Sequence, residues 1–85
     1  MAAVPRPASD LKTLGSVLRA FRRESGLTQE QLSFRSGMTT ALISDTENGK
    51  RNLSFASIAR MLSALDVTWE QFGAALHRAS RRAEG

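Results

Sequence analysis

Apolar residues recur along this chain at spacings of three and four, the periodicity of helices that bury one face. The first such stripe consists of Leu11, Leu14, Val17, Leu18 and Phe21. Ser9 or Asp10 can cap its start, and Gly26 follows its end as a residue free to take positive φ. The pattern predicts a helix over residues 11–25.

A pair of short helices follows, each with its own start signal. Thr28 and Gln31 fit a capping box, and Leu27 and Leu32 flank it as a hydrophobic staple. Gly37 then ends this helix. The next helix is predicted over residues 39–48, with Thr39 as its cap, Asn48-Gly49 as its end, and Leu42, Ile43 and Thr46 at core spacing. Helices this short are marginal alone, so we expect the flanking sequence to hold them in place.

Two more helices are predicted after a polar, basic connector. Ser54 caps the first, whose apolar face comprises Phe55, Ile58, Met61, Leu62 and Leu65. Thr68 and Gln71 form a second capping box, followed by Trp69, Phe72, Leu76 and Ala79 on one side. No strand pattern competes, so the expected fold is an all-α, compact five-helix bundle. It comprises a flexible arm at 1–9, the helical domain at 10–77 and a fraying basic tail at 78–85.

Composition restricts the candidate chemistry. The 85 residues allow one small domain, and the absence of cysteine excludes disulfides and thiolate metal sites. His77 is a lone histidine and predicts no metal site. No nucleophile–base pair or glycine-rich phosphate loop is present, so neither an enzyme nor a cofactor is expected. No apolar run is long enough for a membrane span, and no signal peptide is recognisable, which favours a cytoplasmic protein.

The charge balance is basic. Twelve Lys and Arg residues oppose eight Asp and Glu residues, for a formal net charge of +4, and ten of the twelve are arginine. Arginine suits phosphate groups and guanine edges, so nucleic acid is one candidate partner. Charge for solubility alone is the equally weighted alternative.

An ordered string of short motifs carries a resemblance to a known family. It comprises Leu14 to Leu18, Gly26 to Leu32, Gly37-Met38-Thr39, Ile43, Glu47 to Asn52, Ser54-Phe55, and Leu65 to Thr68. Over roughly residues 11–73 this string resembles the Cro and phage-repressor (XRE-type) DNA-binding domains. The connector RNLSF and the long last helix are also similar to controller proteins of restriction–modification operons. The resemblance implies a helix-turn-helix in a lambda-repressor-like fold, acting as a sequence-specific transcriptional regulator.

Three residues depart from the family pattern. Thr46 replaces a larger apolar residue, which should loosen the seat of the helix over 39–48. Leu53 replaces a common proline and Asp66 a common glycine, so both turns should differ in detail.

The resemblance assigns base reading to Thr39, Thr40, Ala41 and Asp45, near the start of a helix that would enter the major groove. Hydroxyls can bond several bases, and the methyl groups of Thr and Ala can touch the thymine methyl. Asp45 should either accept from cytosine N4 or hold a neighbouring basic side chain. No Arg or Lys would read guanine from this helix, so DNA shape should contribute to specificity.

A second group is expected to contact the DNA backbone, which positions the protein without reading sequence. It comprises Gln29, Ser44, Asn48, Lys50, Arg51 and Asn52. The alternative is that Gln29 is a solvated first-turn residue and that the others form a hydrophilic turn. Glu47 lies at the end of its helix that disfavours a negative charge. In the resembling family this position forms a structural ion pair with a residue that corresponds to Arg22.

The last helix raises the question of partners. Its pattern continues past Trp69 and Phe72 to Leu76, which predicts a homodimer interface and two recognition helices on a palindromic operator. The alternative is that Trp69 and Phe72 face the first helix. A rival function is an antitoxin that masks a toxin through Phe34, the N-terminal arm or the basic tail. RNA polymerase contact through Asp45 or Asp66 is a third hypothesis.

Overall fold

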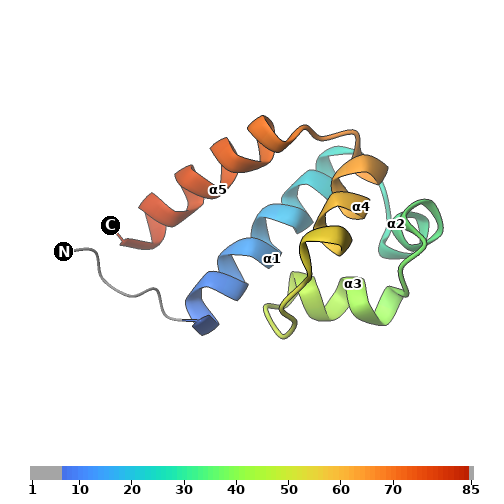
Figure 1. Cartoon of the computed structure of the whole chain (residues 1–85), viewed down its shortest axis with the longest axis horizontal. Coiled ribbons are helices and arrows are strands. Elements are labelled where there is room, and N and C mark those ends of the chain that lie inside the picture. Colours follow the sequence, from blue (N-terminus) through green and yellow to red (C-terminus); the bar gives the residue numbers. More distant parts are fainter. Residues whose placement is uncertain (1–6, 85) are drawn as a thin grey trace.

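The computed structural model describes residues 7–84, and this part of the chain forms five α-helices and no strand (Figure 1). They are α1 (Pro7–Glu24), α2 (Gln29–Ser36), α3 (Thr40–Glu47), α4 (Phe55–Leu65) and α5 (Trp69–Glu84). α1 packs against α3 and α5, whereas α2 packs against α3 and α4. The all-α, five-helix prediction is confirmed. None of these helices is both long and apolar enough to cross a membrane.

Both ends of the helical region extend further than the periodicity indicated. α1 begins at Pro7, so Ser9 and Asp10 lie inside the helix and do not cap it. Proline suits a first helical position, because the N–H it lacks would have no partner there. α5 continues through Glu84, so the tail expected to fray is helical as far as the structure describes it. The first six residues of the expected arm lie outside the described residues.

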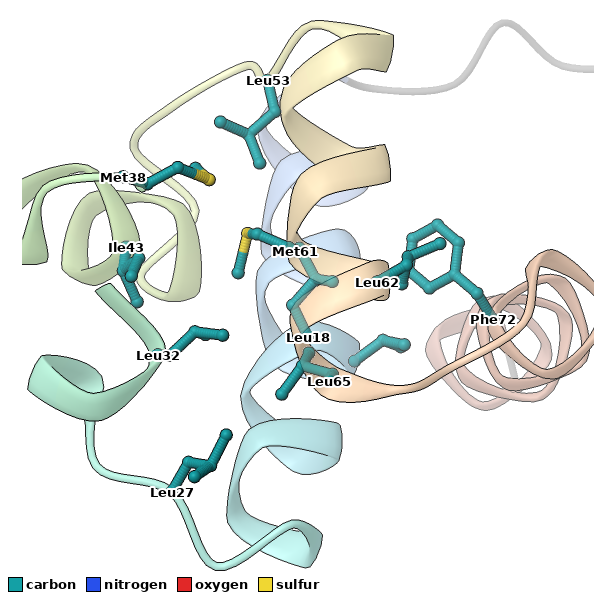
Figure 2. Packing of buried hydrophobic residues seen from close by; sticks show 11 residues of the cluster. Leu18, Leu27, Leu32, Met38, Ile43, Leu53, Met61, Leu62, Leu65 and Phe72 are labelled. Atoms are coloured by element: carbon teal, nitrogen blue, oxygen red, sulfur yellow. The ribbon is translucent and has the colours of Figure 1, made fainter. Parts of the chain in front are cut away.

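The core lies where α1, α2, α3 and α4 meet, and Phe72 of α5 closes one side (Figure 2). Its most deeply buried apolar side chains are Leu18, Leu32, Ile43, Met61 and Leu62. Met38 from the turn after α2 and Leu53 from the α3–α4 connector also belong to this cluster. The short helices α2 and α3 are therefore held by apolar residues from every neighbouring element.

The seat of α3 depends on Thr46, which is completely buried. Its hydroxyl donates to the carbonyl of Leu42 at 2.7 Å, so the polar group has a partner inside the core. Gly15 of α1 lies against the backbone of the same turn of α3, because its missing Cβ lets the two helices approach closely. A Cβ there would lie 2.1 Å from the carbonyl oxygen of Thr46.

Two other features differ from the sequence pattern. Phe55 was placed on the apolar face of its helix, yet it is 74% exposed, because it is the first residue of α4 and lies at the edge of the core. Asp66 takes the left-handed conformation that glycine usually occupies, with φ 57° and ψ 43°, and ends α4. Its N–H still donates to the carbonyl of Ser63 at 3.2 Å, so the turn keeps the hydrogen bonds of a helix end.

Candidate nucleic-acid interface

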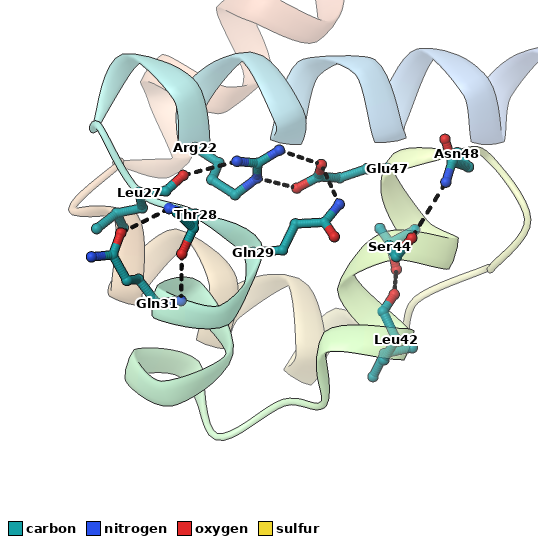
Figure 3. Close-up of polar contacts among 10 residues, drawn as sticks. Arg22, Leu27, Thr28, Gln29, Gln31, Leu42, Ser44, Glu47 and Asn48 are labelled. Atoms are coloured by element: carbon teal, nitrogen blue, oxygen red, sulfur yellow. Dashed lines mark hydrogen bonds and ion pairs between the residues drawn. The ribbon is translucent and has the colours of Figure 1, made fainter.

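α2 starts with the capping box that the sequence predicts. Thr28 Oγ1 accepts from the N–H of Gln31 at 3.1 Å, and the N–H of Thr28 donates to Gln31 Oε1 at 2.8 Å (Figure 3). Leu27, just before this box, and Leu32, in the next turn, are both buried, as expected for a hydrophobic staple. At the other end Gly37 takes φ 73°, in the left-handed region.

The turn between α2 and α3 is fixed by side chains of α2. The Ser33 hydroxyl donates to the carbonyl of Met38, and the N–H of Met38 donates to Ser36 Oγ at 3.2 Å. Thr39 Oγ1 then caps α3 by accepting from the N–H of Leu42 at 3.1 Å. These bonds and the buried Met38 side chain fix the angle between the two helices.

α3 has one buried and one exposed face. Ile43, Thr46 and Glu47 are buried, whereas the four residues proposed to read bases are exposed: Thr39, Thr40, Ala41 and Asp45. The Asp45 carboxylate forms no ion pair within residues 7–84. The structure therefore does not show it holding a neighbouring basic side chain.

The chain leaves α3 through a tight, hydrogen-bonded turn. The N–H of Gly49 donates to the carbonyl of Thr46 at 3.1 Å, and that of Lys50 donates to the carbonyl of Asp45 at 2.8 Å. The side chains expected to grip the DNA backbone are exposed at Asn48, Lys50, Arg51 and Asn52. Ser44 is half-buried, and its hydroxyl accepts a long bond of 3.5 Å from Asn48 Nδ2 (Figure 3).

Arg22 and Glu47 form a buried pair that joins α1 to the end of α3. Arg22 Nε donates to Glu47 Oε2 at 2.7 Å, and Nη2 donates to Oε1 at 2.9 Å. Arg22 Nη1 also donates to the carbonyl of Leu27 at 2.8 Å, which ties the α1–α2 loop to the same group (Figure 3). Hydrogen bonding to Glu47 raises the pKa of Arg22, and burial, which lowers it, is the smaller effect.

Gln29 belongs to the same network, which the sequence did not indicate. Its Nε2 donates to Glu47 Oε1 at 3.1 Å, so the side chain is held at the first turn of α2. Gln29 and Thr40 also line one open depression on the surface, together with Arg22, Thr28 and Glu30. The structure therefore brings one proposed backbone contact and one proposed base reader together.

The three residues expected at a dimer interface have different environments. Phe72 is only 4% exposed and belongs to the core of its own chain, so its assignment to an interface is corrected. Leu76 is half-buried, whereas Trp69 is 46% exposed. Trp69 stacks on Phe55, with ring centroids 4.8 Å apart and planes inclined by 5°. This exposed aromatic pair joins the first residues of α4 and α5.

The roles of two residues that are important to this region were not predicted from the sequence. Gly15 brings α1 against the end of α3, and glycine in the middle of a helix can signal such close packing. Phe55 was assigned to the core, and no sequence signal showed that it would pair with Trp69.

Comparisons with known proteins agree with this geometry. A family model described as a helix-turn-helix domain matches residues 13–75. The protein y4dJ of Sinorhizobium fredii, an uncharacterized HTH-type transcriptional regulator, is 39% identical over 57 residues, which cover 67% of this chain and 74% of y4dJ. RghR of Bacillus subtilis, an HTH-type transcriptional repressor, is 41% identical over 61 residues, which cover 71% of this chain and 45% of RghR. This chain thus spans less than half the length of RghR.

A solved structure shares the fold. It is the restriction–modification controller protein C.Esp1396I, a tetramer in complex with its natural 35 base-pair operator. The similarity has a TM-score of 0.79 at 30% identity and covers 82% of this chain and 92% of the controller chain. The resemblance to helix-turn-helix regulators and controller proteins is confirmed. The antitoxin alternative finds no support in these comparisons.

Proposed function

We propose that this chain, which belongs to the helix-turn-helix domain family, regulates transcription by inserting α3 into the major groove of operator DNA. One observation carries the proposal. The outer face of α3 presents the exposed side chains of Thr39, Thr40, Ala41 and Asp45, and a basic connector follows directly at Lys50 and Arg51. Protein–DNA interfaces combine side chains that contact base edges with basic side chains that contact phosphates.

The two groups of residues have different roles in this proposal. Thr39, Thr40 and Ala41 contact base edges through hydroxyl and methyl groups, and Asp45 accepts from a cytosine amine. The residues proposed to contact phosphates, and so to fix how deeply α3 enters the groove, are Gln29, Ser44, Asn48, Lys50, Arg51 and Asn52. Because no basic side chain reads guanine, contacts with base edges provide modest specificity, and DNA shape provides the rest. No catalytic step and no cofactor belong to this function.

A homodimer completes the proposal. The stacked rings of Phe55 and Trp69 expose a large apolar surface that a second copy would cover. In such a homodimer, two copies of α3 about 34 Å apart would match successive major grooves on one side of a palindrome. C.Esp1396I, one of the solved structures that this chain resembles, forms a tetramer in complex with its operator.

The experiment is a binding series in which salt and sequence vary independently. Affinity for duplex DNA should fall steeply between about 50 and 200 mM salt, because each phosphate contact contributes about −0.9 to the slope. Enrichment of binding sequences from a random library should show that Thr40→Ala changes the preferred bases. Lys50→Ala should lower affinity for all sequences by the same factor. An affinity insensitive to salt would refute the proposed contacts with phosphates and thus this mode of DNA binding. If both variants lost affinity uniformly for all sequences, the division of roles would be refuted.

A further inference from the structure

The α3–α4 connector lies close to the N-terminal half of α1 where Gly49 meets Lys12. A Cβ on Gly49 would lie 2.7 Å from Cγ, 3.0 Å from Cα and 3.1 Å from the backbone N of Lys12. Gly49 also has φ 73°, so glycine is required there both for its conformation and for the space. Figure 1 shows this connector beside the N-terminal half of α1. Lys12 is therefore seated against the connector, although the two are far apart in sequence.

The Lys12 side chain is exposed, and only its stem is engaged. No hydrogen bond or ion pair holds its ammonium group among residues 7–84, whereas its Cγ lies against the position of Gly49. A lysine packed in this way keeps its charge in solvent beyond the contact. The residues that follow Gly49 are Lys50 and Arg51, both exposed. Lys12 thus adds a third cation to the connector from a different element.

We infer that Lys12 binds a phosphate of the DNA backbone and forms a single grip with Lys50 and Arg51. This inference rests on the proposed function, and the ligand is a phosphodiester of duplex DNA. If Lys12 served only to support the connector, its stem would suffice, and a positive charge beside a connector that already carries Lys50 and Arg51 would add like charge to it. A polyanion beside the connector converts this repulsion into attraction.

The test measures binding of a random-sequence duplex by fluorescence anisotropy over a range of salt concentrations. Lys12→Gln keeps most of the stem and removes the charge, whereas Lys12→Arg keeps the charge. The matched control is Arg60→Gln, on the face of α4 beside the end of α2. Each protein's melting temperature is measured in parallel, so a loss of fold is separated from a loss of contact.

Lys12→Gln should reduce the magnitude of the salt slope by about 0.9 per subunit, with an unchanged melting temperature. Lys12→Arg should keep the slope of the original protein, and Arg60→Gln should leave it unchanged. Lys50→Gln is measured as the positive control, since Lys50 is a proposed phosphate contact. The inference fails if Lys12→Gln leaves the slope unchanged while Lys50→Gln reduces it, and the proposed function then stands. It also fails if Lys12→Gln lowers affinity only together with the melting temperature. If neither lysine affects binding, the proposed function fails as well.

Discussion

Gly15 of α1 and Thr46 of α3 are in backbone contact, so close that a Cβ on Gly15 would lie 2.1 Å from the carbonyl oxygen of Thr46. This Cβ on Gly15 would also lie 2.8 Å from the carbonyl oxygen of Glu47. These carbonyls belong to the last turn of α3, just before the connector. The position of the proposed recognition helix therefore depends on the absence of one methyl group in α1.

Gly15→Ala should destabilise the protein, because a backbone carbonyl cannot rotate away as a side chain can. We expect a loss of about 3 kcal/mol in the free energy of unfolding, at the upper end of overpacking costs. Gly73→Ala is the matched control, since a Cβ there meets no atom within 4 Å. Glycine loses more conformational entropy than alanine when a helix forms, so Gly73→Ala should stabilise the protein by about 0.5–1 kcal/mol. Urea unfolding would measure both, and equal gains would contradict the close contact.

Substitution of either Arg22 or Glu47 alone should lower the free energy of unfolding substantially. The two side chains are 10% and 1% exposed, so removing one partner leaves the other with a buried, unpaired charge. Glu47→Ala should cost about 3–5 kcal/mol, and the double variant with Arg22→Ala should cost less than the sum of the two single changes. Glu30→Ala, on the exposed surface of α2, is the control and should stay within about 0.5 kcal/mol. Additive losses would show that the two side chains do not interact in solution.

The raised pKa of Arg22 also fixes the pH dependence of this pair. A folded-state pKa above the unfolded value gives stabilisation that is complete below the unfolded pKa and is lost only as pH rises through the folded one. Both values lie far above neutrality, so titration of Arg22 should leave stability unchanged from roughly pH 6 to 9. Thermal melts of the original protein and of the double variant Arg22→Ala/Glu47→Ala, which leaves neither charge unpaired, should therefore keep a constant difference across this range. A difference that shrank toward pH 9 would contradict the assignment.

Dimerisation should depend on the exposed aromatic pair. Trp69→Ala removes a large side chain that is 46% exposed and stacked on Phe55, and such anchors often contribute about 2 kcal/mol or more to an interface. We expect the dimer dissociation constant to rise by about 30-fold. Phe34→Ala, at an aromatic residue of α2 that is 91% exposed, should leave the constant unchanged. Analytical ultracentrifugation can test this, and an original protein that stays monomeric when bound to DNA would refute the dimer.

The left-handed conformation of Asp66 predicts a stabilising substitution. Asp66 has φ 57° at the end of α4, where a side chain adds steric strain that glycine avoids. Asp66→Gly should raise the free energy of unfolding by about 0.5–1 kcal/mol, and Asp66→Ala should lower it. Thermal denaturation of the two variants and the original protein would measure these changes in stability. A lower free energy of unfolding for Asp66→Gly would show that the Asp66 side chain supplies a needed contact.

Much of the fold could be predicted because its signals are local. The capping boxes at Thr28 and Thr68, and the glycine at Gly37, act within one turn of their own helices, so they can be read from neighbouring residues. The outer ends of α1 and α5 could not be predicted in this way, because both helices extend beyond their apolar stripes. The prediction that Phe55 is buried was wrong. The spacing of apolar residues shows which side of a helix faces the core, whereas burial of the first residue of a helix depends on which other elements pack against that end.

The sequence by itself determined the five helices, the turn that joins α2 to α3, and the polar, small side chains on the outer face of α3. It also carried the family resemblance that paired Arg22 with Glu47. Tertiary structure decided which distant residues meet: Gly15 with Thr46, Gln29 with Glu47, Phe55 with Trp69, and Lys12 with Gly49. Helix formation depends on residues within one turn, whereas these contacts depend on how whole helices cross, which no single stretch of sequence specifies.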